Sequence, residues 1–178
     1  MAILPIYEEP HPILKKVAAP IEAVTDEVRT LIRDMAETMY AAPGVGLAAP
    51  QVGHSIRLLV ADWSQGRDEE GIYAPGELVA LINPVIVSKS GDASTEEGCL
   101  SIPEMLVVVP RAQEIVVQAL DKEGHEIELI LHDFAAIVVQ HEMDHLEGVT
   151  LLDKISTLKR NLYLKRRRKD QDRAAANP

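Results

Sequence analysis

Residues 140–148 read Gln-His-Glu-Met-Asp-His-Leu-Glu-Gly, and they place His141 and His145 four positions apart. In an α-helix, positions i and i+4 lie one above the other, so both imidazoles can reach a single metal ion. Glu142 then projects about 100° away, beside the ion rather than onto it. This arrangement is typical of a metallohydrolase, in which a nearby carboxylate takes a proton from metal-bound water.

The residues before this motif predict that it lies on a core-facing helix. Phe134, Ile137 and Val138 share one helical stripe with the two histidines, at spacings i, i+3, i+4, i+7 and i+11. The alternative is a pair of hydrogen-bonded core histidines without a metal. We expect Asp133 to cap the start of this helix and Gly148 to end it.

Two histidines leave a catalytic metal one protein ligand short, because such sites usually have three protein ligands and one open position. Six residues after His145, where one class of metalloproteases has a third histidine, this chain has Leu151. No glutamate occurs after Glu147 to serve as a downstream ligand. The downstream aspartates are Asp153, close to the motif, and two in a highly charged tail. We therefore expect the third ligand upstream.

Cys99 is the only cysteine of the chain, and residues 96–101 around it read Glu-Glu-Gly-Cys-Leu-Ser. A single thiol forms no internal disulfide, so it is a buried apolar residue, a nucleophile or a metal ligand. With the two histidines it completes a three-ligand site that keeps the fourth position for water. The alternative, a cysteine nucleophile activated by a histidine, predicts inhibition by thiol alkylation and no effect of chelators.

Three separated blocks of the sequence form a recognisable pattern. They are residues 44–51 (Gly-Val-Gly-Leu-Ala-Ala-Pro-Gln), residues 97–101 (Glu-Gly-Cys-Leu-Ser) and residues 140–146 (Gln-His-Glu-Met-Asp-His-Leu). In their order and rough spacing they resemble the bacterial peptide deformylase family, and the similarity runs from near the N-terminus to about residue 160. The resemblance implies an enzyme that removes the formyl group from the N-terminal methionine of nascent chains.

The resemblance also implies roles for individual residues. Glu142 is expected to be the general acid/base, and Gln51 with the backbone amide of Leu100 is expected to hold the oxyanion. Metal-bound hydroxide attacks the formyl carbon in this scheme, Glu142 passes the proton to the leaving amine, and formate is released. The implied metal ligands are Cys99, His141 and His145.

A thiolate donates more charge to a metal than a third imidazole, so the identity of the metal should affect the rate. Ligand type alone allows zinc, iron(II), cobalt or nickel. The resemblance implies one divalent metal ion, with Fe2+ in the cell and Zn2+, Ni2+ or Co2+ as alternatives in purified protein.

The remaining candidate residues are expected to bind N-formylmethionyl nascent peptides. The glycines of residues 44–46 allow an extended peptide to pair with the backbone as an added strand, although Pro43-Gly44 alone reads as a tight turn. The apolar residues before the metal motif form either a pocket for the methionine side chain or part of the core. The substrate-binding candidates are Gly44, Val45, Gly46, Glu97, Gly98, Phe134, Ile137 and Val138.

Three further positions carry specific expectations. Leu106 stands where some bacterial deformylases have an arginine facing the cleft, which leaves peptide binding there open. The loop of residues 63–76 is longer than in compact relatives, and Trp63 in it is expected to be a packing anchor. Glu97 is also expected to pair with Arg111, with a surface carboxylate as the simpler alternative.

Length and composition exclude several classes of protein. The 178 residues are 47% hydrophobic, which is ample for the core of one domain. Because no apolar run is long enough to span a bilayer and the N-terminus is not signal-like, we expect a cytoplasmic protein without membrane association. An aromatic content of 3% argues against single-strand stacking platforms, and no sequence-specific nucleic-acid binding is expected.

Charge divides the chain into an acidic body and a basic C-terminal segment. Residues 1–153 hold 9 Lys and Arg against 26 Asp and Glu, a balance of −17, whereas residues 154–178 hold 9 against 2, a balance of +7. We interpret the first segment as the catalytic region and the second as a basic helix of the same domain, since Ile155, Leu158 and Leu162 have helical spacing. The second segment is either a solvated helix end or, as the resemblance implies, a contact to the ribosome.

The remaining patterns predict an α+β architecture. Thr25 is expected to cap a helix that ends before Pro43-Gly44. The turn-like residues 121–124 predict a hairpin between the strands on either side. Since the strands cluster between two helices, we expect antiparallel sheets packed around the metal-motif helix, with a C-terminal helix. The strand-like runs are residues 56–61, 78–82, 85–87, 106–109, 114–119 and 126–131.

Overall fold

The largest sheet has five strands, and every neighbouring pair in it is antiparallel. Its spatial order is β1–β2–β5–β8–β9, so β1 and β9 form its two edges. This computed structural model describes residues 2–64, 66–67, 73–74 and 76–176. The strands of the sheet are β1 (Gly46–Ala48), β2 (Leu58–Ala61), β5 (Val79–Ser90), β8 (Glu114–Leu120) and β9 (Glu126–His132).

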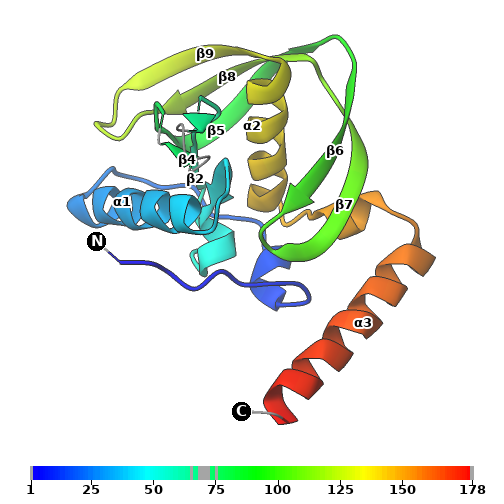
Figure 1. Ribbon diagram of the computed structural model, residues 1–178. Helices are drawn as coiled ribbons and strands as arrows, with labels where there is room; N and C mark the ends of the chain where they lie inside the picture. Colours follow the sequence, from blue (N-terminus) through cyan, green and yellow to red (C-terminus); the bar gives the residue numbers. More distant parts are fainter. Residues whose placement is uncertain (1, 65, 68–72, 75, 177–178) are drawn as a thin grey trace.

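Two hairpins form separate two-stranded sheets. β6 (Ala93–Cys99) pairs with β7 (Ile102–Arg111), and the short β3 (Gly66–Arg67) pairs with β4 (Tyr73–Ala74). Helix α2 (Asp133–Leu146) lies between the five-stranded sheet and the β6–β7 hairpin (Figure 1). The predicted architecture, antiparallel sheets around the helix that carries the histidines, is therefore confirmed.

Helix α1 (Asp26–Ala41) begins where the sequence predicts it. Thr25 caps the helix, because the backbone N–H of Val28 donates to Thr25 Oγ1 at 3.4 Å. Its buried face includes Met35 and Met39, which join one apolar cluster with residues of β1 and β2. Burial of this face fixes α1 against the edge of the sheet that borders the functional site.

One predicted end of α2 is wrong and the other is confirmed. The N-cap residue is His132 rather than Asp133, and no side chain caps the helix. Asp133 has a positive φ of 49°, and its Oδ1 accepts a hydrogen bond from Gln113 Nε2 at 3.0 Å, so its side chain binds a neighbouring segment instead. Gly148 has a φ of 69°, and a Cβ atom there would lie 2.7 Å from the carbonyl oxygen of Lys15, which explains the glycine stop.

Strand β5 joins two runs that the sequence predicts as separate strands, residues 78–82 and 85–87. The strand is irregular between them, with a register shift and a positive φ of 51° at Asn83. The Asn83 side chain accepts a hydrogen bond from the N–H of Ile21 and donates one to its carbonyl oxygen, both at 2.8 Å. This long-range pair stabilises the bulge, and strand periodicity does not reveal it.

The sequence does not predict β6, because its residues, Ala-Ser-Thr-Glu-Glu-Gly-Cys, lack alternating apolar side chains. Its partner β7 extends well beyond the predicted run of residues 106–109. Strand β2 starts at Leu58, whereas the sequence predicts a start at Ile56. The predicted hairpin across residues 121–124 is confirmed as β8–β9.

Hydrogen bonds to Asp62 hold the segment of residues 63–76 in place. Tyr40 Oη donates to Asp62 Oδ2 at 2.7 Å, and the backbone N–H of Gly76 donates to the same oxygen at 2.7 Å. Trp63 packs against the main core cluster, which confirms its expected role as a packing anchor. The expected long loop falls on positions of which 65, 68–72 and 75 lie outside the described residues.

Helix α3 (Thr157–Ala176) projects away from the rest of the molecule (Figure 1). The predicted C-terminal helix is confirmed, although Ile155 lies before its first residue. Tyr163 anchors the helix, because its side chain joins the apolar cluster of β7 and its Oη donates to the carbonyl oxygen of Pro103 at 3.2 Å. None of the described helices has both the length and the apolar character needed to cross a membrane.

Candidate metal centre

Three candidate ligands converge at the end of strand β6 and the C-terminal half of helix α2. His141 and His145 lie one helical turn apart, with ring centroids separated by 5.2 Å. Cys99 is the last residue of β6, and its Sγ lies 3.3 Å from His145 Nε2. The ligand atoms of all three residues lie within 4.8 Å of one another. Within the described residues, this is the one group of three or more such side chains arranged to hold a metal.

The donor set fits a single divalent metal. One thiolate and two imidazoles match a tetrahedral site with three protein ligands, in which the fourth position is left for water or substrate. A second observation supports the fit: Glu142 Oε2 is buried beside the cluster and has no hydrogen-bond partner among the described residues. Buried carboxylate oxygens normally have partners, so this atom is available to a group bound in the site.

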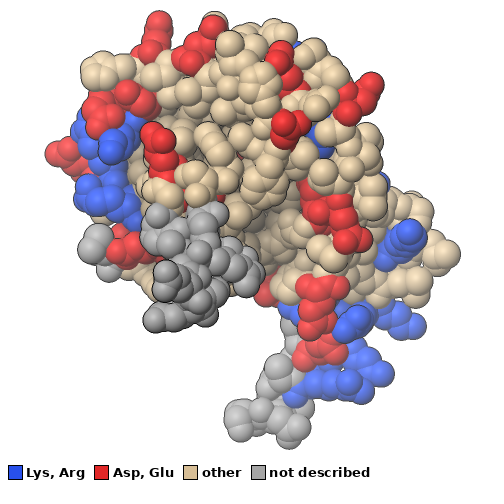
Figure 2. All heavy atoms as spheres, turned by 45° about the horizontal axis from the view of Figure 1, so that its top comes forward, with Lys and Arg blue, Asp and Glu red and all other residues tan. Residues whose placement is uncertain are grey.

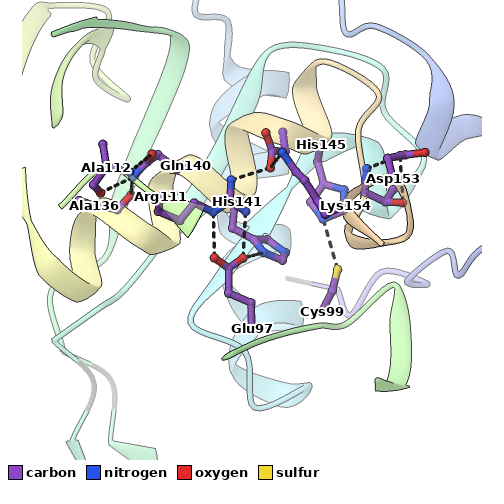
Figure 3. A network of polar contacts seen from close by, with 12 residues as sticks. Glu97, Cys99, Arg111, Ala112, Ala136, Gln140, His141, His145, Asp153 and Lys154 are labelled. Carbon is purple, nitrogen blue, oxygen red and sulfur yellow. Dashed lines mark hydrogen bonds and ion pairs between the residues drawn. The ribbon is translucent and has the colours of Figure 1, made fainter. Parts of the chain in front are cut away.

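His141 is held in one orientation by Glu97. Its Nδ1 lies 2.9 Å from Glu97 Oε2, which leaves Nε2 as the nitrogen available to a metal (Figure 3). Burial alone would raise the pKa of Glu97, but hydrogen bonds from Arg111 and His141 and the charge of Arg111 hold it down at about 2. Glu97 is therefore a carboxylate. The expected pair with Arg111 is confirmed at 2.8 and 2.9 Å.

Glu142 lies on the same turn of α2 as His141 and is 5% exposed. Burial raises its pKa to about 7, and a bound cation lowers the pKa of a neighbouring carboxyl. The backbone of β1 lies directly against it, since a Cβ atom on Gly46 would come within 2.5 Å of Glu142 Oε1. A carboxylate placed in this way can exchange a proton with a group in the centre.

The amide of Gln51 has a fixed orientation. Its Oε1 accepts a hydrogen bond from the backbone N–H of Ala48 at 2.8 Å, so the Nε2 end must face the other way. Nε2 donates to Ser101 Oγ at 3.2 Å and lies 3.7 Å from Cys99 Sγ. The donor end of Gln51 is thus directed at the cluster. Ser101 is fully buried and was missed by sequence reasoning, although it ends the block that contains Cys99.

A cleft of about 350 Å³ opens onto the centre between β1, β6 and α2. Among the described strands, β1 pairs only with β2 and β6 only with β7, so each has an edge without a strand partner there. His145 does not line the cleft. All eight predicted substrate-binding residues line it, together with Gln51, Cys99, Leu100, His141 and Glu142.

The apolar lining residues differ in how deeply they are buried in the core. Val138 belongs to the main core cluster and also lines the cleft, and Ile137 is 7% exposed. Phe134 is 53% exposed at the start of α2. Leu106 is 62% exposed and is not one of the cleft-lining residues. It lies against Gly98, which does line the cleft, because a Cβ atom on Gly98 would lie 3.3 Å from Leu106 Cδ2.

Comparison with known proteins assigns the family. The sequence matches the family model for polypeptide deformylase over residues 3–161. A peptide deformylase of Syntrophobacter fumaroxidans is 42% identical over 176 residues, which cover 99% of this chain and 100% of that protein. This chain belongs to the polypeptide deformylase family. Polypeptide deformylases remove the N-formyl group from nascent peptides, so the chain is a hydrolase of protein biosynthesis.

Solved deformylase structures share the fold. A crystal structure of a peptide deformylase from Legionella pneumophila has a TM-score of 0.87 and 40% identity, and it covers 99% of this chain and 100% of its own. A class I type b peptide deformylase from Acinetobacter baumannii, solved with Met-Ala-Ser bound, has a TM-score of 0.78 and 33% identity over 86% of this chain and 99% of its own. The match to the deformylase family model ends at residue 161, within α3.

Proposed function

We propose that the cleft hydrolyses the formamide bond of N-formylmethionyl peptides, with Cys99, His141 and His145 as ligands of one divalent metal. The observation that carries the proposal is the buried Glu142 carboxylate, whose Oε2 has no partner among the described residues and lies beside three converging ligand atoms. A divalent metal in such a site lowers the pKa of a coordinated water, which supplies the nucleophile, and polarises the carbonyl.

Glu142 moves the proton in this proposal. Its Oε2 accepts the proton of the attacking water and passes it to the nitrogen that leaves, so formate and a free amine are released. Its burial and its contact with the backbone of Gly46 keep the carboxylate in one place during both transfers. Positioned general acid/base groups typically contribute about 10²- to 10⁴-fold to the rate.

Gln51 and the backbone N–H of Leu100 are proposed to hold the oxyanion. The Ala48 N–H fixes the Gln51 amide so that its donor end faces the centre. Leu100 directly follows Cys99 and lines the cleft, so its backbone lies next to the ligand sulfur. Donors of this kind each stabilise a transition state by about 2.7–4 kcal/mol.

The peptide is proposed to bind as an extended strand between the unpaired edges of β1 and β6. Backbone hydrogen bonds to such edges give affinity for a peptide without regard to its sequence. The methionine side chain is proposed to contact Val45, Ile137 and Val138, with Phe134 at the exposed end of this apolar wall. The Acinetobacter relative with bound Met-Ala-Ser supports a peptide that begins with methionine.

The proposed cellular metal is iron(II), with Zn2+, Ni2+ and Co2+ as alternatives in purified protein. A thiolate with two imidazoles accepts all of these metals, and the thiolate softens the Lewis acidity of each. Metal identity is therefore expected to change the rate. We propose an anaerobic assay of formate release from formyl-Met-Ala-Ser with protein loaded with each of the four metals.

The central experiment compares wild-type protein with Glu142→Gln and Glu142→Ala. Wild-type protein is expected to release formate, and both variants to lose at least about 10²-fold in kcat while still binding the metal. Glu22→Gln, which alters an exposed and unpaired carboxylate, is the matched control. Absence of formate release in every metal form contradicts the proposed function, and full turnover in Glu142→Ala contradicts the role of Glu142.

We further propose that residues 1–153 form the catalytic region and that residues 154–178 are a basic helix of the same domain that contacts the ribosome in the cytoplasm. Figure 2 shows Lys and Arg side chains gathered on α3, with acidic side chains at its base. Arg167 pairs with Glu8 in this region. Lys165, Arg168 and Lys169 are exposed and form no ion pair with any described residue, so their charge is available to a polyanion.

The test of this contact is the salt dependence of ribosome binding. Replacement of Lys165, Arg168 and Lys169 with Gln is expected to weaken binding and to reduce its dependence on salt, with unchanged turnover of a free formylated peptide. The control replaces three exposed cations of the body, Lys16, Lys89 and Lys122, with Gln. Equal ribosome affinity of the two triple variants contradicts the proposal.

A further inference from the structure

Arg111 is buried next to the metal centre but does not line the cleft. It is the last residue of β7, and its side chain is 5% exposed. The guanidinium holds Glu97 at both oxygens, with Nε donating to Oε1 at 2.8 Å and Nη2 donating to Oε2 at 2.9 Å. Because Glu97 in turn contacts His141, we propose that Arg111 is a positioning residue that fixes the orientation of this metal ligand.

The register of the β6–β7 hairpin explains why Arg111 and Glu97 meet. Arg111 is paired with Ala93 and Glu97 with Val107, so alternation puts both charged side chains on the inner face of the hairpin, four residues apart along it. The sequence predicts this pair, with a surface carboxylate as the alternative for Glu97. The hairpin adds the geometry, since it presents a guanidinium and a carboxylate together toward α2 (Figure 3).

Helix α2 presents a complementary pair. His141 and Asp144 are at positions i and i+3 and therefore lie on one face of the helix. His141 Nδ1 lies 2.9 Å from Glu97 Oε2, and Arg111 Nη1 donates to Asp144 Oδ2 at 2.7 Å. The hairpin and the helix are thus joined by two parallel polar contacts, of which one ends on a metal ligand.

Stability alone does not account for this arrangement. Burial of Arg111 and Glu97 removes two charges from water, and a buried ion pair often contributes no more than an apolar pair of similar volume. A bidentate pair does fix geometry, because both carboxylate oxygens are held and the carboxylate cannot turn. Glu97 Oε2 then stays within hydrogen-bond distance of His141 Nδ1. The other ring nitrogen of His141, Nε2, stays directed at Cys99 and His145. Partners of this kind typically change metal affinity about 10- to 100-fold when they are lost.

Asp144 extends the arrangement toward the surface. Its Oδ2 accepts from Arg111 and also from Lys154 Nζ at 3.0 Å, and its side chain is 25% exposed. Asp144 therefore orients Arg111 from the side opposite Glu97. Because water can replace part of this contact, we expect Asp144→Asn to have a smaller effect than a change at Arg111.

The experiment uses Co2+ as the probe and rests on the proposed metal centre. The measured quantities are the rate at which excess chelator removes Co2+, the visible absorption of bound Co2+ at full occupancy, and the melting temperature. Arg111→Lys keeps the charge but loses the two-pronged contact, so we expect 10- to 100-fold faster release and an altered spectrum. Arg57→Lys is the matched control, because Arg57 pairs with Glu147 at 2.6 Å without reaching a ligand.

The outcomes separate positioning from stability and from the proposed function. Faster release and a changed spectrum in Arg111→Lys, with neither change in Arg57→Lys, support the proposal. Wild-type release and spectrum in Arg111→Lys overturn it. If Arg111→Lys does not fold, Arg111→Gln takes its place with the same expected and overturning results. Wild-type protein that binds no Co2+ contradicts the metal centre itself, whereas wild-type protein that binds Co2+ leaves only the role of Arg111 at stake.

Discussion

Gly46 and Glu142 are in such close contact that no side chain fits between them: a Cβ atom on Gly46 would lie 2.5 Å from Glu142 Oε1 and 2.9 Å from Glu142 Cγ. From the sequence, the glycines of residues 44–46 are expected to let a peptide come close to the backbone. The structure adds a second reason at Gly46, because the edge strand β1 forms one wall of the space that the Glu142 carboxylate occupies. The position of the strand and the position of this carboxylate are therefore linked.

Gly46→Ala is expected to displace the Glu142 carboxylate and to lower kcat by about 10- to 100-fold, since a shift of about 1 Å at a reacting group has costs of this order. The readout is kcat for formyl-Met-Ala-Ser, with melting temperature as a check on folding. A double-mutant cycle isolates the cause. In a Glu142→Ala background, Gly46→Ala should cost little more; a full additional loss contradicts the proposed link.

Gln51→Ala is expected to lower kcat by about 10²- to 10³-fold with a smaller change in KM, because an oxyanion donor acts in the transition state. Gln118→Ala is the control, since the Gln118 side chain is exposed on β8 and, within the part of the chain that the structure describes, bonds only Glu128. Steady-state kinetics at full metal occupancy measure both variants. A proportional rise in KM with unchanged kcat points to substrate binding and contradicts the oxyanion role.

The helix of the metal motif was predictable because its ligands and its apolar residues share one helical period. His141 and His145 must lie on the same face as Ile137 and Val138 to be both buried and one turn apart. Pattern and chemistry agree there, so the sequence is informative. Cys99 could be inferred for a different reason, since the chain has no second cysteine and no glutamate after residue 147.

Strand β6, in contrast, cannot be predicted from local sequence patterns. Its inward-facing residue Glu97 is only 7% exposed, although it is charged. The alternation of apolar and polar residues that marks a half-buried strand is therefore absent at this position. The partner that neutralises it, Arg111, lies 14 residues away. The bulge of β5 at Asn83 likewise depends on Ile21, 62 residues distant. Contacts between distant residues determine these features, and local periodicity does not encode them.

Gln140 is expected to matter for stability rather than for chemistry. Its Oε1 accepts from the N–H of Ala112 at 3.0 Å, and its Nε2 donates to the carbonyl oxygens of Ala112 and Ala136 at 2.9 and 3.0 Å. Gln140→Ala leaves the partly buried N–H and carbonyl oxygen of Ala112 without these partners, at a cost of up to about 1–3 kcal/mol for each group left unsatisfied. Urea unfolding measures the loss against Gln118→Ala, and equal midpoints for the two variants contradict it.

Removal of the metal distinguishes the two proposed uses of Cys99. A metal ligand predicts that chelators abolish formate release, that Co2+ restores it, and that bound metal slows alkylation of the thiol. Metal at a concentration of about 100 times its Kd should also stabilise the fold by about 2.7 kcal/mol, seen as a higher melting temperature. Full activity in metal-free protein, with loss of activity on alkylation, favours the cysteine nucleophile.

Asp62 is expected to make stability depend on acidity. Burial alone would raise its pKa, but hydrogen bonds from Tyr40, Ser64 and the backbone of Gly76 hold the pKa below its usual value. A carboxyl with a lowered pKa in the folded state binds a proton more readily when unfolded, so its stabilising effect is complete above the unfolded pKa of about 3.9. The effect is lost as the pH falls through the lower folded value.

The measurement for Asp62 is the free energy of unfolding of wild-type protein and Asp62→Asn between neutral and acidic pH. The difference between the two is expected to be constant near neutrality and to shrink below about pH 4. Asp92→Asn, which removes the charge of an exposed carboxylate, is the control. A difference that grows as the pH falls would mean that the pKa of Asp62 is raised, and that burial outweighs the hydrogen bonds from Tyr40, Ser64 and Gly76.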